Sequence, residues 1–261
     1  MIGVQSKSLL PVVALLLSLS AQATLAASQL TNFLYSNFQS KGYEPLATLT
    51  LGADFVNVGL AQTLTLLPPF ENHYTATHPS QTAVDFGGFL GVERTFLPNL
   101  NAQLGASVYI DSQLTAKGHV WQFGVPKFDN FTYDYHIQPV RVMVTNKLLT
   151  TLPRYQSMHP YFSWEIGAAF NQASNYHENS IVPLVTPMSP FSRHTETSFA
   201  WGVGLGMDYS VTQHVRAGMG YQFSNLGSAS LGRTSAETTS QSLSLSHLYT
   251  NQLRLQLTYL A

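Results

Sequence analysis

The sequence lacks cysteine, is poor in charged residues and has no long apolar run after its first 19 residues. Without cysteine the chain forms no disulfide and cannot be anchored as a lipoprotein. Charged residues make up 10% of the chain, against about 25% in ordinary soluble domains. The formal net charge is −1 and no basic block occurs, so nucleic acid is not expected as a partner. A helical membrane protein is also excluded, because a spanning helix needs about 20 apolar residues.

The N-terminus has the three parts of an export signal. Lys7 supplies the positive charge, residues 9–19 form an apolar stretch, and a small-x-small pattern ends at Ala23. The apolar stretch is short for a membrane anchor, which is the alternative interpretation. We therefore predict a cleaved signal peptide, with Ala26 or Ala27 as alternative cleavage positions.

Three segments follow from this assignment. Residues 1–23 are the predicted signal peptide, and residues 24–45, with scattered aromatic residues and no clear period, form a periplasmic lead-in. Residues 46–261 contain the regular pattern described next.

Residues 199–223, FAWGVGLGMDYSVTQHVRAGMGYQF, alternate with a period of two. One parity carries large apolar and aromatic residues, whereas the other carries glycine, polar and charged residues. Such alternation indicates strands, and the short polar break at Thr212 and Gln213 indicates a β-hairpin. A soluble sheet would bury the apolar face against a second layer, whereas a membrane barrel turns it toward lipid.

Eight segments share this alternation, and their connections alternate in length. The predicted strands are about 46–58, 82–96, 100–112, 132–147, 160–172, 199–209, 215–223 and 249–260. The long connections are 59–81, 113–131, 173–194 and 224–248; the short ones are 97–99, 148–159 and 212–213. The pattern predicts an all-β fold, an eight-stranded antiparallel up-and-down transmembrane β-barrel with its short turns and both termini in the periplasm. Because lipid offers no partner to an open sheet edge, the last strand must pair with the first.

The fourth predicted strand shows an irregularity. Tyr133, Tyr135 and Ile137 share one parity, but the valines that begin at Val140 share the other. A one-residue slip reverses the facing of every side chain, so we predict a β-bulge near residues 138–139.

Charged residues fall on the parity that faces the barrel interior. They are Asp54, Asp85, Glu93, Glu165, Asp208, Arg216, Arg254 and, given the bulge, Arg141. An eight-stranded barrel is just wide enough for side chains to fill it, and buried charges must pair or stay hydrated. We expect an ion-paired interior; the alternative is a narrow gated pore.

Two segments of the chain resemble those of a known family. The segments WGVGLGMDY (201–209) and VRAGMGYQFSNLG (215–227), together with the signal peptide and eight strands, resemble the small eight-stranded outer-membrane barrels of Gram-negative bacteria, the opacity-protein and OmpA-like transmembrane group. The resemblance implies a surface antigen, adhesin, minor porin or structural barrel. It also implies recognition of the C-terminal strand by the barrel-assembly machinery, although the chain ends on Ala261 rather than the usual aromatic residue; Tyr259 is a possible substitute.

No catalytic, cofactor-binding or metal-binding residue is predicted, and no cofactor. The glycines of GVGLG (202–206) lie on one face of a strand and lack the context of a phosphate loop. Ser224-Asn225 is similar to a segment of outer-membrane lipid A deacylases, but Gln222 stands where those enzymes have histidine, so Ser224 has no evident base.

The predicted loops and strand ends carry the remaining candidates. His73, His78, His119, His177 and His247 fall in the loops without metal-site spacing, and Tyr133, Tyr135, Trp201, Tyr209, Tyr221 and Phe223 are expected at the lipid interface. Residues 228–246 are rich in serine and threonine and are expected to be mobile.

We conclude from the sequence that the protein is an integral barrel of the cell outer membrane, not an enzyme, whose four long surface loops serve a structural or surface-interaction role of the adhesin or antigen kind. The alternatives are a narrow porin for small hydrophilic solutes and an outer-membrane lipid-modifying enzyme. Its expected partners are outer-membrane lipid and lipopolysaccharide, the assembly machinery, and a host-surface or phage ligand at the loops.

Overall fold

The computed structural model describes residues 42–59, 61–65, 69–77, 79–187, 190–234 and 241–261. The predicted signal peptide, and the predicted lead-in up to residue 41, lie outside the described residues. The first strand, β1 (Tyr43–Asn57), begins within the predicted lead-in. No helix among the described residues is long and apolar enough to cross a membrane.

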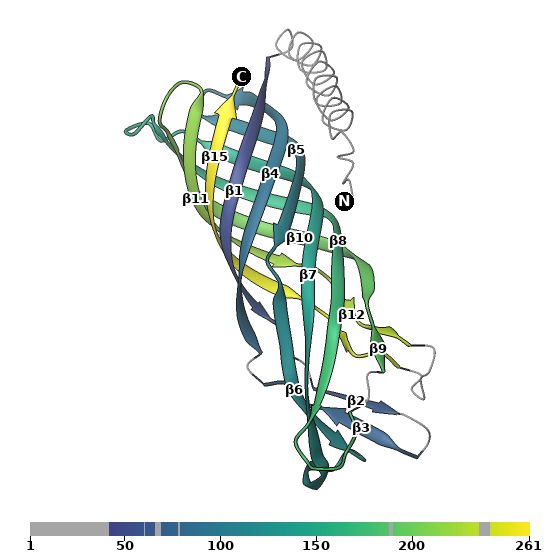
Figure 1. Cartoon of the computed structure of the whole chain (residues 1–261). Coiled ribbons are helices and arrows are strands. Elements are labelled where there is room, and N and C mark those ends of the chain that lie inside the picture. The colour runs from purple at the N-terminus through teal and green to yellow at the C-terminus, as the bar shows by residue number, and fades with distance from the viewer. Residues whose placement is uncertain (1–41, 60, 66–68, 78, 188–189, 235–240) are drawn as a thin grey trace, which may run out of the picture.

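Eight long strands form a closed antiparallel ring (Figure 1). In ring order they are β1, β4 (Ser80–Leu97), β5 (Leu100–Asp111), β7 (Asp129–Thr150), β8 (Met158–Ser180), β10 (His194–Ser210), β11 (Val215–Asn225) and β15 (Tyr249–Leu260). The ring closes where β1 pairs with β15, from Leu46 opposite Leu260 to Val56 opposite Thr250. The predicted eight-stranded barrel and its predicted closure are both confirmed.

The short connections gather at one end of the barrel, which we call the turn end. It holds the Pro98–Asn99 turn and the connections 151–157 and 211–214. Backbone hydrogen bonds join these segments, because Thr151 donates to Asn99 and Leu260 donates to His214. The start of β1 and the end of β15 lie at this end too (Figure 1).

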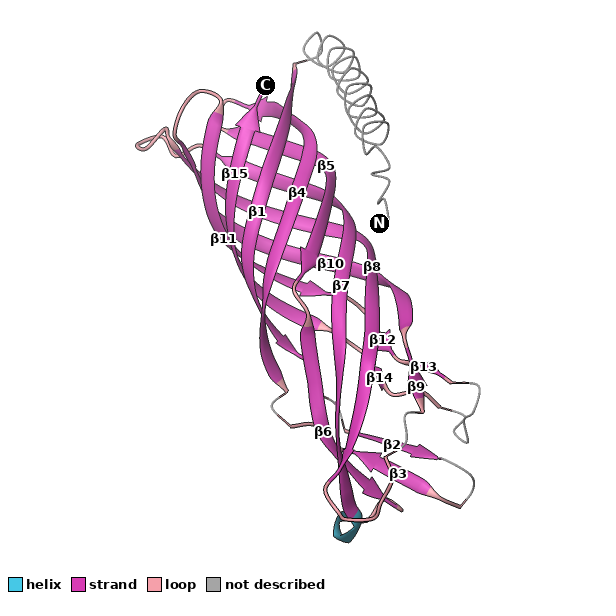
Figure 2. Ribbon diagram, in the orientation of Figure 1, coloured by secondary structure: helices cyan, strands magenta, loops and turns pink. Residues whose placement is uncertain are grey.

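At the opposite end the four predicted long connections contain further strands, which the alternation had not predicted. We call this region the extension. It contains the parts of β7 and β8 that lie farthest from the turn end, together with β2 (Gln62–Thr65), β3 (Glu71–Tyr74), β6 (Leu114–Gln122), the 3₁₀ turn η1 (Pro126–Phe128), β9 (Phe191–Ser192), β12 (Ala229–Ser230), β13 (Gly232–Arg233) and β14 (Ser244–Leu245). Figure 2 shows η1, in cyan, at the far end of the molecule from the turn end. Within residues 228–246, β12 pairs with β14, and β13 pairs with β9.

The bulge predicted in the fourth strand was wrong for β7, which keeps one parity inward from Phe131 to Leu149. The interruption lies in the neighbouring strand, where β5 ends at Asp111 and β6 begins at Leu114, opposite residues 138–139. A second shift in register lies on the other side, where β8 carries an extra residue beside Asn175, whose φ is 55°. The tyrosines of β7 therefore point inward and the valines point outward, along one strand whose own alternation is unbroken.

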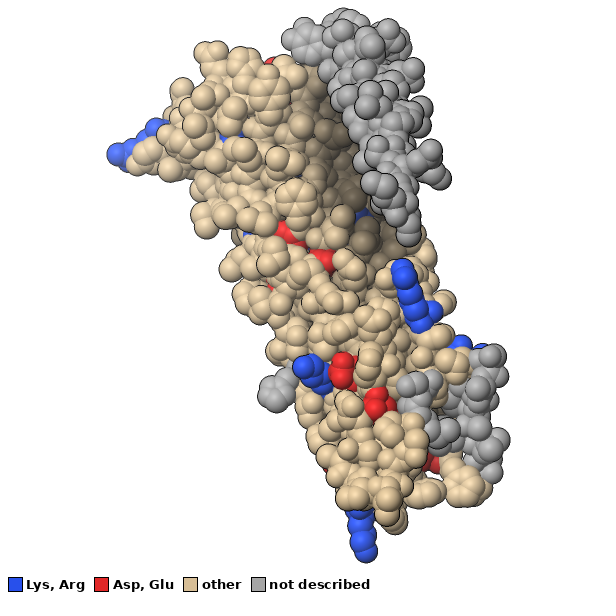
Figure 3. Space-filling view, viewed as in Figure 1, with Lys and Arg blue, Asp and Glu red and all other residues tan. Residues whose placement is uncertain are grey.

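The barrel wall is apolar on its outside. Residues that alternate along the strands, such as Leu90 with 70% of its surface exposed and Leu205 with 63%, point away from the interior. In the view of Figure 3, charged side chains appear only as scattered spots on this wall. Typical soluble monomers expose contiguous apolar patches of no more than about 300–600 Å², whereas this band runs around the ring: Leu49, Leu51, Phe86, Val108, Ile110, Val142, Val144, Phe162, Ile166, Phe199, Met219, Leu253, Leu255 and Leu257.

In the extension the polarity is reversed. There the inward side chains are apolar and form the main hydrophobic core, which includes Tyr74, Tyr133, Tyr135, Ile137, Tyr176, Phe191, Leu226, Leu231, Leu245 and Leu248. This reversal explains the misleading pattern of β7. It also corrects the expectation that Tyr133 and Tyr135 anchor the barrel at a lipid interface, because both are buried inside.

Glycines of the hairpin β10–β11 make room inside the barrel for a large neighbour. A Cβ atom on Gly220 would lie 2.1 Å from the Tyr161 hydroxyl oxygen, and one on Gly206 would lie 2.6 Å from it. Neither substitution fits without movement, so these glycines position Tyr161 in the lumen. Gly206 ends the GVGLG run (202–206), whose glycines the alternation had placed on one face of a strand.

Candidate functional site

The barrel interior is the candidate site, because most charged side chains of the barrel strands point into it. The eight residues predicted to point inward are all buried: Asp54, Asp85, Glu93, Arg141, Glu165, Asp208, Arg216 and Arg254. The structure adds Asp111 and Lys147, which sequence reasoning missed. Parity could have found both, since each lies an even number of residues from an assigned inward position, Asp111 from Tyr109 and Lys147 from Arg141.

One group of charges surrounds Arg141, and we call it the Arg141 cluster: Arg141, Arg254, Asp54, Asp85, Asp111 and Glu165. The Arg141 Nη2 atom donates to Asp111 Oδ1 at 2.7 Å and to Asp85 Oδ1 at 3.0 Å, and Asp54 Oδ2 lies 3.8 Å away. These residues come from four strands, so the cluster ties β1, β4, β5 and β7 together across the lumen.

Arg254 extends this cluster from β15. Its Nε atom lies 3.2 Å from Asp85 Oδ2, and its Nη1 atom donates to Gln222 and lies 3.9 Å from Glu165. Both guanidinium groups lie over the Tyr109 ring, with its centroid 4.2 Å from Arg254 Cζ and 5.0 Å from Arg141 Cζ. Two cations thus share one buried aromatic ring in the lumen.

A second group, the Lys147 cluster, lies nearer the turn end and consists of Lys147, Asp208, Glu93 and Arg216. Lys147 donates to Asp208 at 2.6 Å and sits 3.9 Å above the Tyr161 ring. Arg216 binds both oxygens of Glu93 at 2.6 and 3.0 Å. Bidentate contact of this kind is the strongest geometry for an arginine–carboxylate pair.

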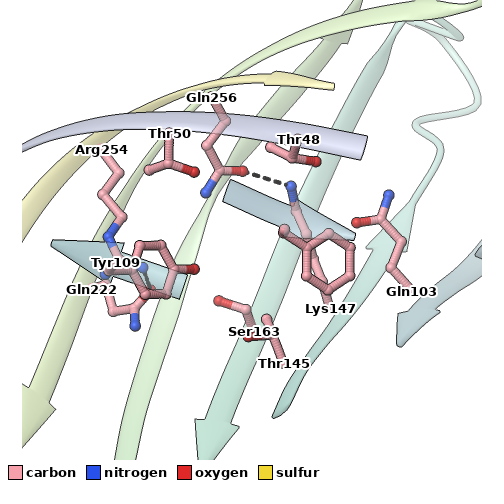
Figure 4. A pocket seen from close by; sticks show the side chains of 11 residues that line it. Thr48, Thr50, Gln103, Tyr109, Thr145, Lys147, Ser163, Gln222, Arg254 and Gln256 are labelled. Carbon is pink, nitrogen blue, oxygen red and sulfur yellow. Dashed lines mark hydrogen bonds between the residues drawn. The ribbon is translucent and has the colours of Figure 1, made fainter. Parts of the chain in front are cut away.

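Between the two clusters the lumen encloses a cavity of about 30 Å³. Polar side chains surround it, including Gln103, Tyr109, Ser163 and Gln256 (Figure 4). Lys147 donates across it to Gln256 at 2.9 Å. This volume is about that of a single water molecule.

Asp54, Asp85 and Asp111 form the one group of possible metal ligands found among the described residues. Their oxygens converge on the Arg141 guanidinium, which already supplies a positive charge at the position a cation would take. His78 lies outside the described residues, whereas His73, His119 and His177 lie in strands rather than loops. The expectation that the chain has no metal site stays a prediction.

An apolar core lies inside the extension. The Tyr133 ring stacks on Tyr135 and Tyr176 at centroid distances of 6.2 and 6.1 Å, and Phe191 meets Tyr176 edge-on at 4.9 Å. Burial raises the pKa of the Tyr133 hydroxyl to about 12, so the group stays neutral. Its hydroxyl donates to the backbone carbonyl of Thr75 at 2.9 Å, which satisfies the one polar group of the ring.

Ser224, the candidate nucleophile of a lipid-modifying enzyme, is fully buried in the lumen. Its hydroxyl lies 3.3 Å from the Gln222 amide nitrogen and 3.4 Å from the Gln252 amide oxygen. Amides cannot act as a general base, and the side chain faces away from the outer wall. The structure therefore offers no geometric support for deacylase chemistry at Ser224.

Comparison with known proteins gives one relative and several distant structural similarities. No family model matches the chain. The chain is 26% identical over 196 residues to outer membrane protein PagN of Salmonella typhimurium, covering 70% of this chain and 74% of that protein.

Among solved structures, the outer membrane protease OmpT of Escherichia coli is 10% identical at a TM-score of 0.42, covering 84% of this chain and 97% of OmpT. Neisserial surface protein A is 12% identical at a TM-score of 0.39, covering 84% and 96%. The resemblance predicted from the sequence is confirmed at the level of fold and of an outer-membrane relative.

Proposed function

We propose that the protein is an integral barrel of the outer membrane with a closed lumen, and that its role is interaction at the cell surface through the extension. The observation that carries this proposal is the filling of the interior. The Lys147 cluster, the Arg141 cluster and the apolar core of the extension follow one another along the barrel axis.

The membrane assignment is supported by the apolar outer wall and the polar interior, the reverse of a soluble barrel. The relative PagN carries the name of an outer-membrane protein. In outer-membrane barrels short turns face the periplasm, so the turn end lies inside the cell and the extension outside.

The extension has the properties of a rigid display platform. It has its own hydrophobic core, and strands β3, β6, β7 and β8 continue side by side beyond the barrel. Its far end is therefore held at a fixed place well away from the membrane, which suits contact with another surface.

Planar-bilayer recording of the purified protein tests the closed lumen. We expect no steady conductance steps, because the clusters and the core occupy the lumen. Steady steps from the intact protein, persisting in a variant that lacks residues 66–68 and 235–240, would establish the narrow-porin alternative.

Orientation can be tested in intact cells because the chain has no cysteine. A membrane-impermeant maleimide should label Val125→Cys in the extension and leave Gln156→Cys at the turn end unlabelled until the cells are lysed. Heat-modifiable migration in gels provides the accompanying check that the variants are folded barrels.

The remaining parts of the proposal concern processing and partners. We propose cleavage after Ala23, and N-terminal sequencing of the mature protein decides between this position and Ala26 or Ala27. Recognition by the assembly machinery through β15, contact with lipopolysaccharide, and a host or phage ligand are likewise proposed. Mass analysis of lipid A after overexpression tests the enzymatic alternative, which a changed acylation pattern would support.

A further inference from the structure

Four strand ends converge at the end of the extension that lies farthest from the turn end. Asn72 of β3 pairs with Gln122 of β6, and Trp121 of β6 pairs with Asp129 of β7. The Ile181 amide, just after β8, donates to the Asn130 carbonyl at 2.9 Å. The described residues next to these strand ends therefore lie close together.

This surface is apolar although it faces solvent. Phe70, Phe123 and Phe128 are 50%, 52% and 42% exposed, and the Phe123 ring meets the other two edge-on at 5.7 and 5.6 Å. We define the apolar tip as Phe70, Phe123, Val125 and Phe128. Further exposed apolar side chains, Ile181, Val182 and Leu184, follow β8 beside it.

The backbone at the tip holds Phe123 in an unfavourable conformation. Phe123 has a φ of 58° and Gly124 one of 66°, and the Val125 amide donates to the Gln122 carbonyl at 3.3 Å to close the turn. Glycine and asparagine adopt such a φ readily, whereas a phenylalanine does so at a cost. Burial of the ring does not offset this cost, because half of the side chain is exposed. An exposed aromatic residue at a strained position suggests a function for the ring.

The segment that carries three of the four tip residues holds one cationic side chain. Lys127, within η1, is the one charged residue of the segment 122–128. The neighbouring carboxylate of Asp129 is paired with His119 at 3.0 Å, and the exposed Glu71 lies on β3. Phenylalanine rings beside a lysine are the composition of segments that enter the interface of an anionic bilayer.

We propose that the apolar tip inserts into the surface of a second, opposing phospholipid bilayer and that Lys127 favours anionic headgroups there. This inference rests on the proposed orientation, which turns the extension outward. Figure 2 shows η1, which carries Phe128, at the end of the molecule farthest from the turn end, and a fluid bilayer accepts exposed rings that a preformed protein groove would have to match in shape. A protein ligand is the competing outcome of the test.

The test uses the full-length protein in nanodiscs, with an environment-sensitive dye on Val125→Cys or, as the matched control, on Gln156→Cys. Protein-free vesicles of phosphatidylcholine, with or without phosphatidylserine, are then added. We expect the tip dye to brighten and shift to the blue, more strongly with phosphatidylserine, and to be quenched by lipids that carry a quencher in the acyl chain. The dye at residue 156 should not respond.

Substitutions then separate insertion from folding. Phe123→Asn suits the positive φ, and together with Phe128→Ser it should weaken vesicle binding at least about ten-fold, since each ring contributes a substantial apolar area. Lys127→Glu should abolish the preference for phosphatidylserine. Phe96→Ser, which removes an equally exposed ring near the turn end, should leave binding unchanged.

Two results would overturn the inference. One is a tip dye that responds no more than the dye at residue 156. The other is a response to protein-containing cell membranes that disappears with protein-free vesicles, which would indicate a protein ligand. Failure of the proposed orientation would show separately, because the maleimide would then not reach Val125→Cys in intact cells.

Discussion

Arg141 Nη2 lies 2.7 Å from Asp111 Oδ1 inside the barrel, at the level where β5 gives way to β6. The arginine has no exposed surface, and two further carboxylates, Asp54 and Asp85, face the same guanidinium. Arg141 thus offsets the mutual repulsion of three acidic groups drawn from three different strands, and Arg254 pairs with one of them, Asp85, at 3.2 Å.

Arg141→Met should therefore destabilise the barrel strongly. Removing one partner of a buried ion pair typically costs about 3–5 kcal/mol, and here three carboxylates lose their common partner. The measurement is the denaturant midpoint of the folded, heat-modifiable form in detergent. Arg94→Met, at an exposed arginine near the turn end, is the control and should change the midpoint little. If adding Asp111→Asn to Arg141→Met recovers no stability, the electrostatic explanation is wrong.

Gly220→Ala should destabilise the barrel through contact with Tyr161. The added Cβ would lie 2.1 Å from the tyrosine hydroxyl, and overpacking typically costs about 1–3 kcal/mol. Tyr161→Phe in the same chain removes the clashing oxygen and should restore part of the loss. Gly88→Ala is the matched control, because its Cβ would meet nothing closer than 3.8 Å. Equal thermal midpoints for the two alanine variants would contradict this reading.

Alanine substitutions at Gly227 and Gly124 distinguish the cost of backbone strain from the cost of a steric clash. Both have positive φ, 73° and 66°, but a Cβ on Gly227 would lie 2.3 Å from Ser198 Cβ, whereas one on Gly124 would meet nothing within 4 Å. Gly124→Ala should thus cost only the strain, about 1–2 kcal/mol. Gly227→Ala should cost more, and differential scanning calorimetry can compare them. We expect the lower thermal unfolding midpoint for Gly227→Ala. A lower midpoint for Gly124→Ala would contradict the steric explanation.

Tyr135→Ala should unfold the extension more readily, because the ring is 96% removed from solvent within the apolar core. Large aromatic-to-alanine changes in cores cost about 3–5 kcal/mol. Tyr209→Ala, at an outward position of β10 with 49% exposure, should cost much less. Limited proteolysis of the extension provides the readout. Similar cleavage rates would mean that Tyr135 does not support the core.

Much of the barrel could be predicted because alternation reports which side chains face lipid. Strand β15 was predicted with its observed bounds, 249–260, since Leu253, Leu255 and Leu257 meet lipid while Arg254 meets the lumen. The charges of the lumen followed from the same parity. Their pairing did not, because partners such as Arg141 and Asp54 are brought together only when distant strands close into a ring.

The extension could not be predicted in the same way. In the extension the outer face of a strand meets water and the inner face meets an apolar core. Apolar side chains therefore move from the outward to the inward positions although the strand continues. Tyr133 and Val140 therefore looked like evidence for a bulge. The apolar tip was missed for a different reason: no periodicity marks a short turn, and its exposed phenylalanines become visible only when β3, β6, β7 and β8 end side by side.

The pairing of β1 with β15 also constrains the order of assembly. The hydroxyls of Thr48 and Thr258, 210 residues apart, lie 2.8 Å from each other across that seam. Contacts of such separation form late, since the entropy of closing the intervening chain must be overcome first. Without β15, which pairs with β1 on one side and β11 on the other, the sheet keeps two unsatisfied strand edges that lipid cannot solvate. A truncation at the C-terminus should thus abolish the barrel as a whole, however far the lost residues lie from the surface that the protein displays.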